Sequence, residues 1–447
     1  MNLHPLSWPT PSQEPVMFSF FARKPAVGVL ALVLVLGAGV VLAHRSSSGP
    51  REPLPLSISS KPPTPPPSWR GKLDLRRAVV TGSRVEQRLE DGTRVELTLD
   101  PRLQKSALSI LERYELPYGG IVAYDIRTGE VKALAGRSQR DPKLGAQRLC
   151  LAPWAPAASV FKVITAAGLL SRGVPSSTSV CYHGGRRGLR SHHLREMPKI
   201  DTTCRTLSDA IAKSINPIMA KLSNRYLDRD LLLAWSQRFG FNKAIPFDLP
   251  VVPSKAEIPT DKLERARTAA GFWHTEISVL HGAVIAGVPA SGGLVRWPHL
   301  VRKVIRPDGR VIRPERQEGR RVMPSDQARE LGAMMARTVS PIGSGRRGFI
   351  SRRGKYYLGD FKVAGKTGSL SRRQPRLLYS WFVGFAPVKK PELAFAVLLG
   401  NPPRWRIKAS GAARMLLAAY LEPKRSQTKR SNKRKRRAKR KTHPAKR

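Results

Sequence analysis

A chain of 447 residues with 80 lysines and arginines against 31 aspartates and glutamates has a formal net charge of +49. A charge of this size indicates contact with a polyanion through binding that weakens with salt. Length sets a second limit. The stretch between residues 92 and 421 has room for one large domain of mixed helix and strand with its insertions, and this excludes two independent enzymes.

Residues 26–43 form an uninterrupted apolar segment that follows Arg23 and Lys24. This pattern predicts one membrane-spanning anchor, with its N-terminus in the cytoplasm and the remaining chain outside. A cleaved signal peptide is the alternative, because Val41 and Ala43 satisfy the small-residue rule for cleavage. The apolar run is longer than a usual signal-peptide core, so we expect a single-pass, uncleaved anchor in the inner (cytoplasmic) membrane and a periplasmic domain.

The segment after this anchor is rich in proline and serine up to about residue 68. Such a composition predicts a stiff, extended spacer, which we expect over residues 44–91. The spacer would hold the folded domain away from the bilayer.

Ser159 and Lys162 stand three residues apart in the apolar range 151–171, where Lys162 is the only ionisable side chain. Pro156 near the start and Gly173 beyond the end predict a helix, and apolar residues on nearly every face predict that this helix is buried. Because burial disfavours an ammonium group, we expect a lowered pKa for Lys162 and a neutral amine that can take up a proton.

The spacing i, i+3 places Lys162 beside the hydroxyl of Ser159 on one face of the helix. A neutral amine in this position can activate the hydroxyl as a nucleophile, and the positive end of the helix dipole favours a developing oxyanion. A core helix whose lysine extends past its apolar neighbours to solvent is the alternative.

Cys181 and Cys204 flank a segment just before Ser214 and Asn216, where a disulfide would close an insertion. Three cysteines suit an oxidising compartment, and Cys150 would remain free.

The same segment contains His183, His192 and His193, which raises the alternative of a zinc site. Their spacings match no standard zinc template, so we expect loop histidines without a metal or cofactor.

Ser214 and Asn216 lie between a predicted helix that ends near Lys213 and another that follows at Pro217. Proline favours the first helical position and pushes the preceding residue out of helical geometry, so Asn216 is explained well as an N-cap. That role does not explain Ser214. Its hydroxyl can relay a proton for Lys162 while the Asn216 amide holds a substrate carbonyl.

Lys366, Thr367 and Gly368 lie in a short alternating run that predicts a strand, and two further strands follow. Gly365 and Gly368 leave the backbone open, so an edge strand here can pair with an extended peptide. Lys366 and Thr367 would then offer a cation and a hydroxyl to a terminal carboxylate. An exposed strand in a very basic protein is the alternative.

Residues 424–447 carry fourteen lysines and arginines and no acidic residue. Such a segment cannot bury a core, so we expect a disordered tail that binds polyanions. Outside the inner membrane, anionic lipid, lipopolysaccharide or anionic wall polymer is a better candidate than nucleic acid. A passive, solvated tail is the alternative.

Three short signatures follow one another along the chain: Ser159 with Lys162, Ser214 with Asn216, and Lys366–Gly368. In this order they resemble the transpeptidase domain of penicillin-binding proteins, and the resemblance covers roughly residues 94–421. Four further stretches are similar to parts of that family. Residues 97–108 match its first helix, 119–136 its first hairpin, 271–293 its long core helix, and 380–387 the strand after Lys366–Gly368. Ser369 departs from the usual threonine, residues 343–349 replace the usual Gly-Thr-Ala element, and the following loop carries Arg372, Arg373 and Arg376.

The resemblance implies that Ser159 is the acylated nucleophile, Lys162 its general base and Ser214 a proton relay. The backbone N–H groups of Ser159 and Ser369 would form the oxyanion hole. The residues implied in substrate binding are Asn216, Lys366, Thr367, Gly368 and Ser369.

The implied activity is peptidoglycan D,D-transpeptidation, in which stem peptides are cross-linked through an acyl-serine and β-lactams inhibit. A D,D-carboxypeptidase, a class D-like β-lactamase or sensor, and a non-catalytic penicillin-binding scaffold are the alternatives. Proteins of the division or elongation machinery are expected partners beside stem peptides.

We expect an α/β (α+β) fold in which an antiparallel sheet is flanked by helices on both faces, with an additional helical subdomain. The sheet would contain the hairpin at 119–136 and the strands near Phe361, Tyr379 and Leu393. The expected segments are 1–25 in the cytoplasm, 26–43 as anchor, 44–91 as spacer, 92–421 as transpeptidase domain and 422–447 as basic tail.

Overall fold

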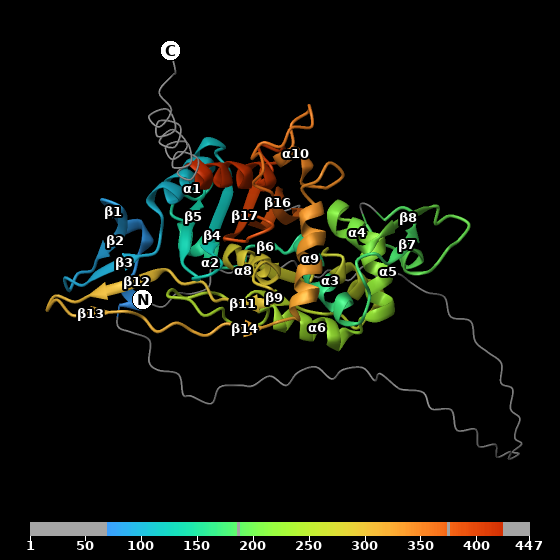
Figure 1. Ribbon diagram of the computed structural model, residues 1–447, viewed down its shortest axis with the longest axis horizontal. Helices are drawn as coiled ribbons and strands as arrows, with labels where there is room; N and C mark the ends of the chain where they lie inside the picture. The colour runs from blue at the N-terminus through green and yellow to red at the C-terminus, as the bar shows by residue number, and fades with distance from the viewer. Residues whose placement is uncertain (1–68, 186–187, 373–375, 423–447) are drawn as a thin grey trace, which may run out of the picture. The chain divides into compact units, whose positions relative to one another are not determined.

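The computed structural model describes residues 69–185, 188–372 and 376–422 (Figure 1). The anchor expected over 26–43 lies outside these residues, as does the basic tail from residue 423 onward. Within the described ranges, no helix is both long enough and apolar enough to cross a bilayer.

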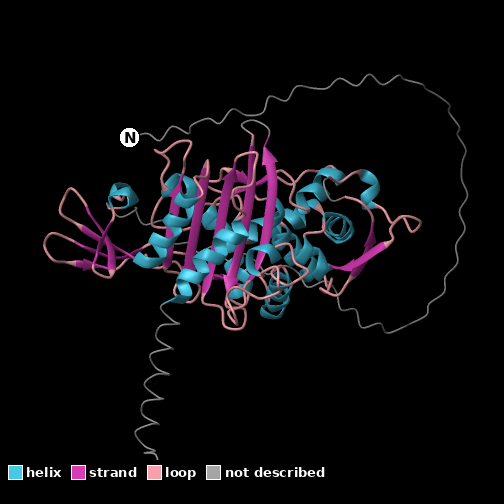
Figure 2. Cartoon of the chain, turned by 90° about the horizontal axis from the view of Figure 1, so that it is seen from above, coloured by secondary structure: helices cyan, strands magenta, loops and turns pink. Residues whose placement is uncertain are grey.

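A five-stranded antiparallel sheet forms the centre of the domain, as the sequence predicted, and Figure 2 shows its strands side by side with helices around them. Every side chain of β17 is buried, which explains why its sequence is an apolar run without alternation. Phe361 precedes the first of these strands instead of lying in it. In order across the sheet, the strands are β15 (Ala364–Arg372), β16 (Leu377–Ala386), β17 (Leu393–Asn401), β4 (Tyr118–Asp125) and β5 (Val131–Arg137).

Helices cover both faces of this sheet. Helix α1 (Pro101–Arg113) packs on β5, and residues 409–422, which are helical, bury apolar side chains in the same cluster. Helix α8 (Val279–Ala290) packs on the other face against β16 and β17. Eleven successive residues of α8, 279–289, are buried, as expected for a helix that is apolar all round. It is shorter than the expected 271–293, because the preceding residues form a turn and strand β10 (Thr275–Ile277).

A helical half lies against the α8 face of the sheet and contributes most of the larger apolar core. Asp261, Asp228 and Thr206 cap three of its helices by accepting the backbone N–H three residues ahead. Its helices are α3 (Lys162–Ser171), α4 (Leu207–Lys213), α5 (Asn216–Tyr226), α6 (Arg229–Arg238), α7 (Lys262–Ala269) and α9 (Ser325–Arg337).

A second five-stranded sheet stands beside the central one. It joins strands from two distant parts of the sequence, and its first two strands lie inside the range expected to be spacer. The folded part therefore begins earlier than residue 92, because Val85 and Gln87 alternate inward and are buried. The strands are β1 (Val79–Thr81), β2 (Arg84–Arg88), β3 (Arg94–Leu97), β12 (Val301–Ile305) and β13 (Val311–Ile312).

The hairpin insertion, defined as residues 179–206, projects from the helical half. Strand β7 (Ser179–Tyr182) pairs with β8 (Thr203–Thr206), and a disulfide joins Cys181 to Cys204 across them. Cys150 is a free thiol in the core, where burial raises its pKa to about 12. The remaining short elements are α2 (Ala146–Leu151), β6 (Ala155–Pro156), β9 (Lys255–Ala256), β10 (Thr275–Ile277), β11 (Leu294–Val295), β14 (Arg320–Arg321) and α10 (Arg346–Phe349).

Candidate active site

Ser159 lies in a 3-10 turn, Ala158–Val160, that runs directly into α3. The expectation of one helix from Pro156 is wrong for its first turn, because Pro156 pairs with β10 in a short strand. Ala158 has a φ of 50°, in the left-handed region that alanine rarely occupies. Strain of this kind is maintained where the surrounding structure fixes the backbone, and here it fixes the residue before Ser159.

Lys162 is fully buried, as the apolar sequence around it predicted. Its ammonium nitrogen Nζ lies 2.8 Å from Ser159 Oγ, 2.8 Å from Asn216 Oδ1 and 2.5 Å from the carbonyl oxygen of Ala270. Burial lowers the pKa of Lys162 well below its ordinary value, and the nearby charge of Lys366 lowers this pKa further. The lysine is therefore suited to accept the Ser159 proton near neutral pH.

Ser214 and Asn216 stand at the junction of α4 and α5. Ser214 ends α4 in the left-handed conformation with a φ of 62°, and its hydroxyl accepts a hydrogen bond from Lys366 Nζ at 2.8 Å. The N-cap explanation for Asn216 is wrong: Ile215 occupies the cap position, and Asn216 is the first residue of the helix. Its side chain points into the site, because Oδ1 accepts from Lys162 and Nδ2 donates to the Gly185 carbonyl at 3.3 Å.

Lys366 extends from β15, the edge strand of the central sheet, and its side chain is fully buried. Besides Ser214, its Nζ donates to the carbonyl of Thr367 at 3.0 Å. Burial lowers the pKa of Lys366 to about 7. Burial thus lowers the pKa of both lysines, and the charge of Lys366 lowers that of Lys162 further, so Lys162 is suited to act as the neutral base.

Thr367 points its hydroxyl toward Ser344, with the two oxygens 2.6 Å apart. Gly368 lies in a tight space: a Cβ atom there would be 3.0 Å from Trp381 Cβ and 3.2 Å from Ala158 Cβ. The edge strand can therefore approach the turn that carries the nucleophile. Ser369, one residue further along this strand, is exposed and lines the cavity described next.

A cavity of about 330 Å³ opens onto these groups. It contains Ser159 and Asn216 on one side and Ser369 on the strand side. Gly271, which has a φ of 80°, forms part of its wall, and a Cβ atom there would lie 2.2 Å from the Ala158 carbonyl oxygen. The other lining residues are Ala270, Phe272, Leu370, Ser371, Leu378 and Trp405.

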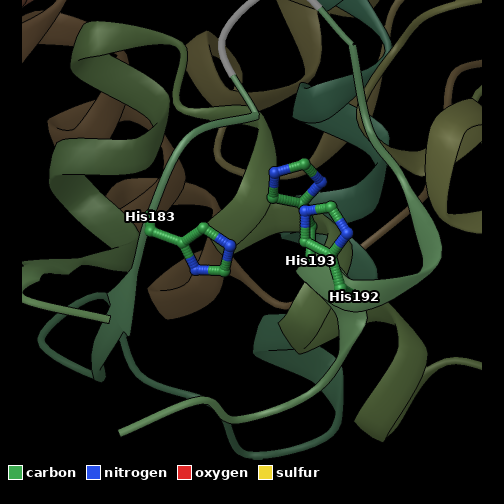
Figure 3. A group of neighbouring side chains, drawn as sticks. All are labelled: His183, His192 and His193. Carbon is green, nitrogen blue, oxygen red and sulfur yellow. The ribbon is translucent and has the colours of Figure 1, made fainter. Parts of the chain in front are cut away.

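Three histidines of the hairpin insertion lie together, as Figure 3 shows, with one ring nitrogen of each within 4.8 Å of the others. His183 Nδ1 faces Asp201 Oδ1 at 2.6 Å, which leaves its Nε2 for a ligand. His193 is less suitable. Burial and the neighbouring His192 and His183 lower its pKa, so the ring is neutral at pH 7, and its Nδ1 accepts the Arg190 N–H at 2.9 Å.

A neutral imidazole that accepts at Nδ1 carries its proton on Nε2. His193 in this orientation thus offers no lone pair to the cluster, and two imidazoles do not complete a structural zinc site. The arrangement of the three rings therefore gives no basis for assigning a metal site to these histidines.

Several contributors to the site were not predicted from the sequence, among them the lining residues Phe272, Leu378 and Trp405. Gly185, Ala270 and Gly271 act through backbone atoms or through a missing side chain, which no residue pattern reveals. Ser344 lies in the Gly343–Gly345 element that stands in place of the usual Gly-Thr-Ala, so its position carried a signal.

The arrangement defines a serine acyl-transfer site: a hydroxyl beside a neutral buried amine, next to the edge of a sheet. Residues 119–419 match the family described as the penicillin binding protein transpeptidase domain. The chain belongs to the penicillin-binding protein transpeptidase family.

Known proteins of this family share moderate sequence identity with the chain. It is 26% identical over 356 residues to the peptidoglycan D,D-transpeptidase PbpA of Mycobacterium tuberculosis, covering 72% of this chain and 70% of PbpA. It is also 26% identical over 369 residues to the peptidoglycan D,D-transpeptidase MrdA of Acinetobacter baumannii, covering 69% of this chain and 51% of MrdA.

Solved structures agree with the fold. The ceftriaxone acyl-enzyme complex of penicillin-binding protein A from M. tuberculosis aligns with a TM-score of 0.59 at 25% identity, covering 74% of this chain and 80% of that one. The D,D-transpeptidase domain from Eggerthella lenta aligns with a TM-score of 0.62 at 22% identity, covering 78% and 91%. The expected mixed fold with antiparallel sheets is therefore confirmed.

Proposed function

We infer that this protein is a peptidoglycan D,D-transpeptidase that works through an acyl-enzyme on Ser159. The observation that carries this inference is the 2.8 Å contact between Ser159 Oγ and the fully buried amine of Lys162. Relatives that bear the name D,D-transpeptidase, and a relative captured as a β-lactam acyl-enzyme, support the same reaction.

In the acylation step, Ser159 Oγ attacks the carbonyl carbon of the stem peptide and Lys162 takes the hydroxyl proton. The carbonyl oxygen gains negative charge, which the backbone N–H groups of Ser159 and Ser369 would stabilise. Collapse of this intermediate breaks the peptide bond, and the leaving amine receives the proton from Lys162. In the second step, an acceptor amine attacks the ester carbon and Lys162 takes its proton. A new peptide bond forms, the ester bond to Ser159 breaks, and the proton passes from Lys162 to Ser159 Oγ.

Lys366 has two roles in this scheme. Its charge keeps the neighbouring Lys162 neutral, and its contact with Ser214 places that hydroxyl for proton relay. Thr367, held by Ser344, is the more accessible group for the substrate carboxylate, because Lys366 itself is buried. A fully buried cation still attracts the carboxylate electrostatically at short range.

Among the described residues that line the cavity, none is an aspartate or a glutamate that could activate water. Lys162 can deprotonate an amine or a water molecule, so the proposal of transfer to an amine follows the relatives named D,D-transpeptidase. A long-lived acyl-enzyme would distinguish this function from that of a β-lactamase.

The test is mass spectrometry of the protein after exposure to benzylpenicillin, with tryptic mapping of the adduct. We expect one adduct, on the peptide that contains Ser159, persisting for hours. Rapid release would indicate a β-lactamase, and the absence of any adduct would indicate a non-catalytic scaffold.

Location and further partners belong to the same proposal. A single-pass inner-membrane anchor at 26–43 would place the domain in the periplasm, where the basic tail would meet anionic lipid or wall polymer and division or elongation proteins would be within reach. Removal of residues 424–447 should reduce sedimentation with anionic vesicles at low salt and leave penicillin acylation unchanged. Equal sedimentation across a salt series would show that the tail is passive.

A further inference from the structure

The amide of Asn216 is held at both of its ends. Its oxygen accepts from Lys162 at 2.8 Å, and its nitrogen donates to the carbonyl of Gly185 at 3.3 Å. An amide has one donating and one accepting end, so a fixed carbonyl on one side determines which end faces the lysine. Gly185 belongs to the hairpin insertion, which is therefore in direct contact with the catalytic machinery.

Gly185 can occupy this place only without a side chain. Its φ is 66°, and a Cβ atom there would lie 2.3 Å from Cγ of Pro217, the residue after Asn216. Gly184 before it is also left-handed, with a φ of 53°. The turn thus fits closely against the first turn of α5, and a shift of the turn would move the carbonyl that Asn216 uses.

A buried charge network ties the same insertion to the same helix. Lys221 on α5 donates to Asp201 at 2.6 Å and to the Cys181 carbonyl at 2.9 Å. Asp201 also faces His183 Nδ1 at 2.6 Å and accepts the Met197 N–H at 2.8 Å. The side chains of Lys221 and Asp201 are only 4% and 2% exposed.

Opposing effects act on Asp201. Burial alone would raise the pKa of this carboxyl, but its hydrogen bonds from Lys221, from His183 and from the Met197 N–H prevail and hold the pKa below its ordinary value. The carboxylate is thus charged and fully engaged. His183 lies two residues before Gly185, so the charge network and the Asn216 contact join the same part of the insertion to α5.

A buried ion pair adds little net stability, because desolvation offsets much of its Coulomb energy. It does penalise every arrangement in which one partner loses the other. A pair that joins an insertion to a catalytic helix is therefore better explained as a device for alignment than as a source of stability.

We propose that Asp201, Lys221 and His183 are positioning residues for acyl transfer, which fix the hairpin insertion on α5 so that the Gly185 carbonyl orients the Asn216 amide toward Lys162 and the substrate. The proposal rests on the proposed function, because it assigns the amide to the acylation site. It extends that site to a segment outside the three signatures.

A double-mutant cycle tests the proposal, with the second-order rate of benzylpenicillin acylation of the full-length protein as the readout. Asp201→Asn should lower this rate by about tenfold, within the range of coupling energies between interacting groups. In an Asn216→Ala background, the same substitution should lower the rate by less than about twofold, because the group being positioned is gone. A purely structural role would give equal losses in both backgrounds, and that result would overturn the proposal.

A second variant keeps the test valid if Asp201→Asn fails to fold. Gly185→Ala leaves the charge network intact and pushes the turn away from Pro217, so it should show the same dependence on Asn216. Equal losses for Gly185→Ala in both backgrounds would equally contradict the proposal.

Asp248→Asn is the matched control. Asp248 is buried like Asp201 and accepts two backbone N–H groups, from Leu300 and Val301, but it lies at the second sheet. We expect it to lower the melting temperature and to leave acylation within about twofold of wild type. If wild-type protein forms no adduct at all, the proposed function fails; if it is acylated and the cycle shows no coupling, only the positioning role fails.

Discussion

Helix α3 and the hairpin insertion meet at Asn216 and differ in almost every other respect. Residues 162–170 of α3 are all buried, and Lys162 is their single charge. Most of the described residues of the insertion are exposed, and ion pairs and hydrogen bonds to backbone carbonyls attach it to α5. The helix keeps the Lys162 amine neutral by excluding water, whereas the insertion, in our proposal, orients the Asn216 amide through specific polar contacts.

The two regions also respond differently to change. Apolar burial is non-directional, so the α3 side of the site depends on volume and on keeping water away from Lys162. Hydrogen bonds weaken steeply when distance or angle changes, so the insertion side depends on keeping its hydrogen-bonding groups in place against α5. Substitutions on the helix should therefore alter chemistry, while those in the insertion should alter alignment with smaller losses.

The largest effect is expected for Ser159→Ala. Removal of the hydroxyl leaves the cavity without a nucleophile, so penicillin adduct formation should stop completely while the melting temperature changes little. Mass spectrometry after benzylpenicillin measures this, and Ser171→Ala, at the exposed end of the same helix, is the control. An adduct on Ser214 or Ser369 in the variant would show that the nucleophile is assigned incorrectly.

Lys162→Arg should lower the acylation rate by at least ~10²-fold, the low end of general-base contributions. A guanidinium group remains protonated in proteins, so it cannot take the Ser159 proton. Stopped-flow acylation with a chromogenic β-lactam gives the rate, and Lys105→Arg on the exposed face of α1 is the control. An unchanged rate would exclude lysine as the base, and burial of its amine would then have no part in activating the serine.

The pH dependence of acylation should show two limbs, each changing by up to about tenfold per pH unit. The rate should rise with pH on the acid side, because Lys162 has to be neutral and its pKa is lowered by burial and by Lys366. It should fall as pH rises through about 7, where Lys366 loses its charge.

Lys366→Met should remove the alkaline fall and shift the acid limb to higher pH, since the charge that lowers the pKa of Lys162 would be absent. A wild-type rate that keeps rising to pH 10 would contradict the assignment of charges between the two lysines.

The smallest effect is expected in the insertion. Replacement of both Cys181 and Cys204 by serine removes the disulfide, which joins two residues 23 positions apart in the sequence. The buried pair of Lys221 and Asp201 remains, so acylation should fall only about two- to fivefold, the scale of a modest coupling between neighbouring groups. Acylation rates of the double variant and of Cys150→Ala, which keeps the disulfide, make the comparison. A loss as large as that of Lys162→Arg would show that the insertion contributes as much to the acylation rate as the helix does.

The sequence predicted the α3 side of the site much better than the insertion side. A lone lysine in an apolar run indicates its own burial, so the contact of Lys162 with Ser159 could be expected before any coordinates. Asn216 was ambiguous, because proline after asparagine fits both a cap and a functional amide, and only the position of its side chain decides between them.

Backbone groups explain most of what was not predicted. The Ala270 carbonyl contacts Lys162, and the Gly185 carbonyl contacts Asn216, but any residue supplies a carbonyl. The strands at 79–88 were assigned to the spacer because the preceding segment is rich in proline and serine. They pair locally, β1 with β2 and β2 with β3, and only β3 pairs with the distant β12, a contact that leaves little local trace in the sequence.

The close approach of Gly271 to the nucleophile limits how the protein can evolve under antibiotic selection. Any side chain at this position would collide with the Ala158 carbonyl and displace Ser159, and would impair the natural reaction together with drug binding. The other lining residues include apolar side chains such as Leu378 and Trp405. We expect substitutions that weaken β-lactam binding but spare the natural reaction among these side chains and not at Gly271.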